Sequence, residues 1–109
     1  GVQEKFGKKI GGDILEKKKT LLYIFTYSKL ESEKKLEFEN IFNSNEMQEL
    51  EKINSIKSFY ETSGASEYLK NKVRFYFSEA EMLIEKLELD NDSKKKLNIF
   101  CKTLLNREI

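Results

Sequence analysis

Apolar residues recur every three or four positions between Ser66 and Leu87, and this periodicity most constrains the fold. Charged residues fall mostly on the opposite face, as in an amphipathic helix with one side in water. The chain of 109 residues also contains no proline, which would interrupt long helices. The sequence therefore predicts an all-α protein. The apolar face of this helix comprises Leu69, Val73, Tyr76, Phe77, Ala80, Leu83, Ile84 and Leu87.

Shorter patterns of the same kind predict about five helices in total and no confident strand. Gly64 is expected to end the helix before Ser66, because glycine favours the backbone conformation that closes a helix. The other four helices are expected at Thr20–Leu30, at Ser32–Asn43, from a cap at Ser44–Glu46 to Tyr60, and from the turn at Leu89–Ser93 to Leu105.

The segment Thr20–Leu30 is apolar on almost every side. Its pattern fits a helix buried on more than one face, although a strand has the same apolar content. A small bundle covers such a helix poorly. We therefore expect it to pack against helices that these residues do not include.

Positive charge is concentrated at the beginning of the chain. Residues 1–20 contain six lysines and three acidic residues, a local charge of +3, whereas the whole chain carries +1. A net charge this small provides no general attraction for nucleic acid or membranes. Cys101 is the only cysteine, so an internal disulfide is excluded, and we expect a cytoplasmic protein. Histidine is absent, and no apolar run is long enough to span a membrane.

Three glycines fall among these lysines, and the hydrophobic pattern of residues 1–12 has no clear period, so we expect a loop there. Asp13 is expected to cap the helix that follows. Glycine-freed backbone amides and a helix N-terminus both favour anions, which suggests a phosphate or diphosphate ligand. The same pattern also fits a solvated lysine-rich turn.

The segment FGKKIGGDILEKKKT, residues 6–20, resembles the stretch that follows the second aspartate-rich motif in the polyprenyl synthetase family. The family pattern is a Gly-Lys pair, a spacer, two small residues and Asp, then Lys five positions later and Thr or Ser. Here these are Gly7-Lys8, Gly11-Gly12, Asp13, Lys18 and Thr20. Two weaker resemblances follow in the family's order, the Ser-Gly-Ala helix at 63–89 and the ending LLNRE at 104–108.

The resemblance implies the C-terminal helices of the isoprenoid synthase bundle. It divides residues 1–109 into a diphosphate-binding loop at 1–19 and helices at 20–109. The family condenses an allylic diphosphate with isopentenyl diphosphate and releases pyrophosphate, usually as a homodimer. The resemblance implies that Lys8, Lys18 and Lys9 bind the substrate diphosphate. Asp13 would lie next to a lysine or a metal-bound water, and Arg107 is a weaker candidate for binding isopentenyl diphosphate. The family's Mg²⁺ ligands are aspartates expected before Gly1, so this fragment alone should be inactive.

The sequence departs from the family pattern at two positions. Lys17 stands where glycine is common, which leaves open which of Lys17, Lys18 and Lys19 contacts the ligand, and Lys9 stands where proline is common. The acidic run Asp90–Asp92 is interpreted as a helix cap, not a metal site. Cys101 is expected to be buried. Six aromatic residues are expected in the core or in a subunit interface: Tyr23, Phe25, Tyr27, Phe75, Tyr76 and Phe77.

Two other functional classes remain open from the sequence. One is a non-catalytic helical subunit or scaffold of a prenyl synthase. The other is an unrelated helical module whose lysine-rich segment binds an acidic peptide.

Overall fold

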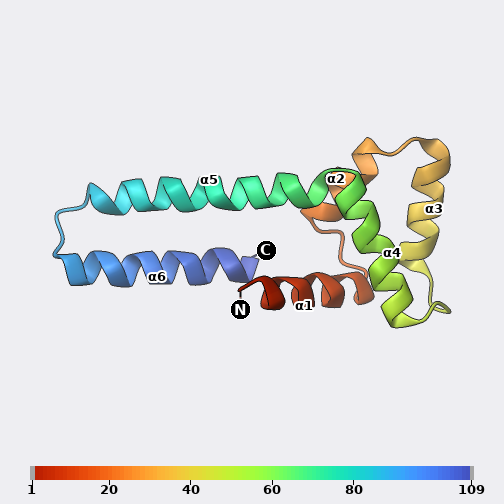
Figure 1. Ribbon diagram of the computed structural model, residues 1–109, viewed down its shortest axis with the longest axis horizontal. Coiled ribbons are helices and arrows are strands. Elements are labelled where there is room, and N and C mark those ends of the chain that lie inside the picture. Colours follow the sequence, from red (N-terminus) through yellow and green to blue (C-terminus); the bar gives the residue numbers. More distant parts are fainter. Residues whose placement is uncertain (1, 109) are drawn as a thin grey trace. The chain divides into compact units, whose positions relative to one another are not determined.

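The computed structural model describes the backbone of residues 2–108 and the side chains of residues 7–104. The described residues form six helices and no strand, so the all-α prediction is confirmed (Figure 1). The helices are α1 (Val2–Leu15), α2 (Leu21–Lys29), α3 (Ser32–Asn43), α4 (Glu49–Thr62), α5 (Ala65–Glu85) and α6 (Asn91–Glu108).

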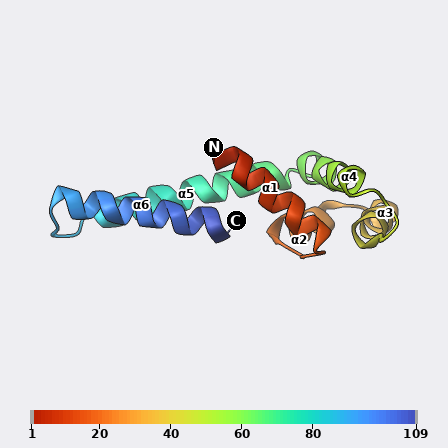
Figure 2. The ribbon, with the colours of Figure 1, turned by 90° about the horizontal axis from the view of Figure 1, so that it is seen from below.

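The chain divides into two compact units. The N-terminal unit, Gln3–Leu69, contains α1 to α4 and the first turn of α5. The C-terminal unit, Lys70–Ile109, contains the rest of α5 and α6. Within this second unit the two helices lie side by side in opposite directions, as both ribbon views show (Figures 1 and 2).

An aromatic cluster forms the core of the N-terminal unit. Phe38 and Phe42 of α3 are completely buried, and the ring centroid of Tyr23 from α2 lies 4.9 Å from that of Phe38 and 4.4 Å from that of Phe42. Phe59 of α4 contributes a third element, with its centroid 5.2 Å from that of Phe38. Close, tilted ring pairs of this kind stabilise a core beyond the area that they bury. The cluster therefore joins α2, α3 and α4.

The expected loop at residues 1–12 is wrong, because α1 extends from Val2 to Leu15. Gly7 and Gly11 are one helical turn apart and face α4. A Cβ atom added to Gly11 would lie 3.5 Å from Ile53, and one added to Gly7 would lie 4.0 Å from Lys57 Nζ. Both distances are ordinary van der Waals contacts, so α1 contacts side chains of α4 at these glycines and an alanine would also fit at Gly11.

Asp13 does not cap the start of a helix, because it lies in the last turn of α1. Thr20 instead precedes the first residue of α2, so this helix begins within one residue of the expected Thr20–Leu30. The extra helix α1 also makes six helices where about five were expected.

Other boundaries match the sequence pattern closely. Helix α3 covers Ser32–Asn43 as expected, and Gly64 has the positive φ of 89° that follows the end of α4. Ser44 does not cap α4, which begins at Glu49. Its hydroxyl accepts hydrogen bonds from the backbone amides of Glu46 and Met47, at 3.3 and 3.2 Å, and so stabilises the turn before that helix.

Within the described residues α2 is buried on one face, and its expected packing against helices that these residues do not include stays a prediction. Leu22, Tyr23 and Thr26 are buried, whereas Leu21 and Ile24 on the other side are exposed.

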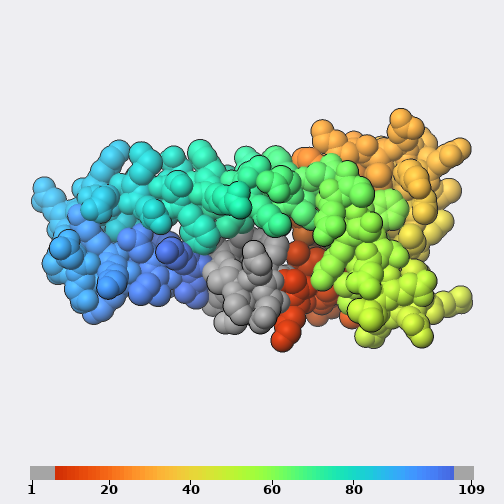
Figure 3. Space-filling model, viewed as in Figure 1, coloured from red at the N-terminus to blue at the C-terminus, as the bar shows by residue number. Residues whose placement is uncertain are grey.

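The remaining burial predictions are only partly confirmed. Tyr23 lies in the core, whereas Tyr27, Phe75 and Tyr76 are exposed, and their place in a subunit interface stays a prediction. Cys101 is half-buried, not fully buried as expected. The C-terminal unit contains two helices, the rest of α5 and α6 (Figure 3), and two helices enclose few side chains completely, although Ile84 is buried.

Candidate functional site

The lysine-rich segment is the turn between α1 and α2. The amides of Lys17 and Lys18 donate to the carbonyl oxygens of Ile14 and Asp13, at 3.0 and 2.9 Å, and these bonds close α1. Lys17 has a φ of 58°, in the left-handed region that favours glycine. The lysines therefore follow a helix C-terminus, whose partial negative charge attracts cations. The idea of an anion site at a helix N-terminus beginning with Asp13 is not supported.

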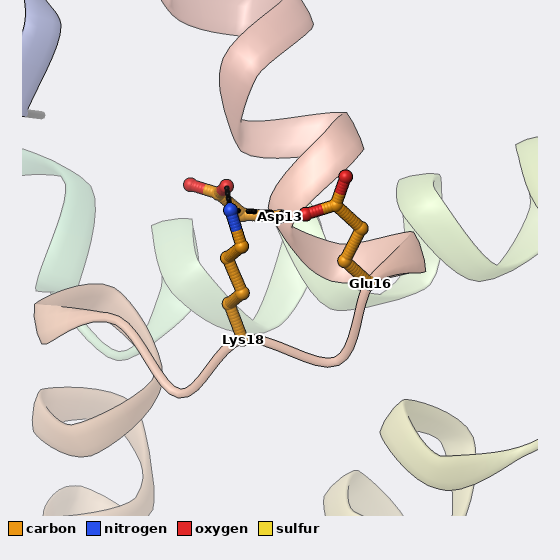
Figure 4. A network of polar contacts seen from close by, with 3 residues as sticks. All are labelled: Asp13, Glu16 and Lys18. Atoms are coloured by element: carbon orange, nitrogen blue, oxygen red, sulfur yellow. Dashed lines mark ion pairs between the residues drawn. The ribbon is translucent and has the colours of Figure 1, made fainter.

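Lys18 lies between two carboxylates at this turn. Its Nζ is 2.9 Å from Glu16 Oε2 and 3.7 Å from Asp13 Oδ1 (Figure 4). The hydrogen bond and charge of Glu16, and then the charge of Asp13, raise the pKa of Lys18, so its ammonium stays charged at neutral pH. The Lys18 side chain is 60% exposed, whereas that of Asp13 is 13% exposed. Two of the expected site residues, Asp13 and Lys18, are thus in contact.

The neighbouring lysines point to other partners. Lys17 Nζ donates to Asn45 Oδ1 at 2.6 Å, in the connection between α3 and α4. Lys19 Nζ lies 5.7 Å from the centroid of the Tyr23 ring, a cation–π distance. The run Lys17–Lys19 is therefore not one cluster of parallel cations.

Helix α1 gives Lys8 and Lys9 different directions. Lys9 precedes Asp13 by four residues and shares its face, whereas Lys8, five residues before Asp13, is turned by about 140° from it. Lys8 is exposed and Lys9 is half-buried. The helical register therefore brings Lys9 closer than Lys8 to the Asp13 side of α1.

Buried side chains of α4 with polar groups lie behind the turn, and sequence reasoning missed Lys52. Lys52 and Tyr60 are 4% and 2% exposed and flank the buried Ile56 at intervals of four residues. Burial raises the pKa of Tyr60 well above its usual range, and the Thr20 side chain, which hydrogen-bonds with Tyr60, opposes this shift. Leu50, although apolar and on the same helix, is exposed. The spacing of four residues from Lys52 to Ile56 and on to Tyr60, which puts the three on one helical face, was the sequence signal that Lys52 is buried.

The described residues do not contain a group of three or more acidic, cysteine or histidine side chains that would hold a metal ion. At the acidic run before α6, Asp90 Oδ1 accepts a hydrogen bond from the amide of Ser93 at 2.7 Å, so its interpretation as a helix cap is confirmed. Arg107 lies outside the residues whose side chains are described.

No protein-family model, curated protein or solved structure matches this chain. Among the described residues, no helix is both long and apolar enough to cross a membrane.

Proposed function

We propose that this chain is the C-terminal part of a trans-isoprenyl diphosphate synthase, in which Lys18 binds the diphosphate of the allylic substrate. The complete enzyme would be a cytoplasmic prenyltransferase of isoprenoid biosynthesis that acts as a homodimer. The contact between Asp13 and Lys18 is the observation that carries the proposal, together with the residue pattern around them.

The geometry supports a lysine that is held in place but free to change partners. Both Lys18 and Glu16 are largely exposed, and exposed ion pairs contribute little stability. A diphosphate, which carries more charge than a carboxylate, would displace Glu16 at small cost. Asp13, which is more buried, would keep the Lys18 side chain oriented toward the ligand.

The chemical role follows from where charge develops in the reaction. Ionisation of an allylic diphosphate leaves negative charge on the departing diphosphate, and a cation placed beforehand lowers the barrier. Lys18, and Lys9 or Lys8 from α1, would supply that charge. The family's Mg²⁺ would add further positive charge when bound, although the described residues contain no group of three or more side chains that would hold it.

Exposed apolar side chains in the C-terminal unit support a place within a larger helical assembly. Phe75, Tyr76 and Leu83 of α5 and Ile99 and Phe100 of α6 are more than half exposed. Such surfaces usually mark contacts with other protein. The helical bundle of a complete prenyl synthase would cover them.

The proposal is tested with the substitution Lys18→Ala in the complete gene product. We expect the turnover of allylic and isopentenyl diphosphates to fall about 100-fold or more, as when a preorganised charge at a transition state is removed. Lys95→Ala is the control, because Lys95 is an exposed lysine of α6. Near-normal turnover of the Lys18 variant would reject its role.

The same assay addresses the main alternative. A folded complete product without turnover would favour a non-catalytic subunit of a prenyl synthase, in which Lys18 only stabilises the turn by pairing with Glu16.

A further inference from the structure

Lys17 occupies a backbone conformation that costs energy for any residue with a side chain. Its φ of 58° lies in the left-handed region, where the Cβ atom is crowded. The side chain is directed away from the carboxylates that hold Lys18 and donates to Asn45 Oδ1 at 2.6 Å. The turn thus places the Lys17 ammonium at the connection between α3 and α4.

Lys52 brings a second ammonium to the same connection. Its Nζ donates to the carbonyl oxygen of Ser44 at 2.9 Å, and Ser44 adjoins Asn45. The Lys52 side chain is almost completely buried, and lysine is rarely so buried without a charged partner. Two lysines that are 35 positions apart in the sequence therefore approach one short segment.

The two ammonium groups are not neutralised by acidic side chains. The acceptors, Asn45 Oδ1 and the Ser44 carbonyl oxygen, are neutral, and the described side chains form no ion pair with either lysine. Burial lowers the pKa of Lys52, and the charge of Lys17 lowers it further. A pair of like charges in partly buried surroundings is unfavourable unless an anion joins it.

We propose that Lys17 and Lys52, beside Ser44 and Asn45, form a binding site for a phosphate-class oxyanion. Each ammonium has three N–H groups and uses one of them in the hydrogen bonds described, which leaves two for a ligand. A tetrahedral dianion can accept from both lysines at once and balances their two charges. This site is separate from Lys18, whose ammonium is paired with carboxylates, and it does not depend on the proposed prenyl transfer.

The test is the thermal unfolding of the whole chain in inorganic phosphate, compared with chloride at equal ionic strength. The melting temperature should rise by about 5 °C when phosphate is at ten times its dissociation constant. Amide signals of Ser44, Asn45 and Lys17 should shift most in a parallel NMR titration.

Lys17→Gly is the decisive variant, because glycine adopts a positive φ without strain and the variant should fold. It should lose the response to phosphate, as should Lys52→Met, which fills the buried space with an apolar side chain. Lys95→Ala, at an exposed lysine of α6, should keep the response.

Three results would overturn the proposal. The first is a wild-type chain that responds equally to phosphate and chloride. The second is a Lys17→Gly variant that keeps the full phosphate response, and this variant decides even if Lys52→Met does not fold. The third is loss of the response in Lys18→Ala with retention in Lys17→Gly, which would place the phosphate at the turn carboxylates instead.

Discussion

Phe38 has a fully buried ring that contacts aromatic rings of α2, α3 and α4. We therefore expect it to contribute strongly to the stability of the N-terminal unit. Phe38→Ala should lower the free energy of unfolding by about 3–5 kcal/mol, through lost burial and the cavity left behind. Chemical denaturation followed by circular dichroism measures this. Leu36→Ala, at an exposed position of the same helix, should change it by less than about 0.5 kcal/mol. Equal effects of the two substitutions would contradict this core.

Tyr60 should make the folding stability of the protein depend on pH. Burial raises its pKa above the ordinary value of 10.0, so the folded protein holds the phenol proton more tightly than the unfolded chain does. The resulting stability is fully present below pH 10 and decreases as the pH rises through the folded-state pKa. Stability should therefore fall above pH 10, and less steeply in Tyr60→Phe, as thermal melts between pH 8 and 11 would show. Parallel curves for the two proteins would refute the assignment.

At the scale of helices, the contact of α1 with α4 limits the size of the side chain that fits at Gly11. A Cβ at Gly11 would meet Ile53 at 3.5 Å, so a methyl group fits but a larger side chain does not, whereas nothing lies within 4 Å of a Cβ at Gly12. Gly11→Leu should cost about 1–3 kcal/mol by overpacking. Gly12→Leu should raise helix stability by roughly 0.5 kcal/mol, since leucine is the better helix former. Both are measured by urea denaturation, and a stabilised Gly11→Leu variant would exclude close packing.

Helix boundaries could be predicted where local signals decide them. Helix α3 was predicted from the apolar spacing after Ser32, and the end of α4 from Gly64. Helix α1 was missed because its glycines were interpreted as a loop, although Gly7 and Gly11 have the spacing of one helical face. Glycine is a poor helix former, so α1 depends on its packing against α4. That packing cannot be predicted from the local sequence.

The same limit applies to the candidate site. The contact of Asp13 with Lys18 is local, within one turn and the following bend, and the family pattern pointed to both residues. Lys52 and Asn45 reach Lys17 only through the packing of α1 and α4, so no spacing rule predicts them.

At the scale of the whole molecule, the two units differ in how well they are enclosed. The N-terminal unit buries an aromatic core, whereas α5 and α6 leave large apolar side chains exposed on both helices. Exposed surfaces of this kind favour a role within a larger assembly over that of an isolated catalyst. The proposed function accordingly predicts that other helices cover these apolar faces.

Magnesium-dependent prenyl transfer, measured on this chain alone and on the complete gene product, tests the central claim most directly. Both samples receive isopentenyl diphosphate and an allylic diphosphate, and the lipid product is counted. The proposed function predicts turnover by the complete product only. The absence of turnover in both samples, with folding verified by circular dichroism, would contradict it and favour a non-catalytic helical subunit.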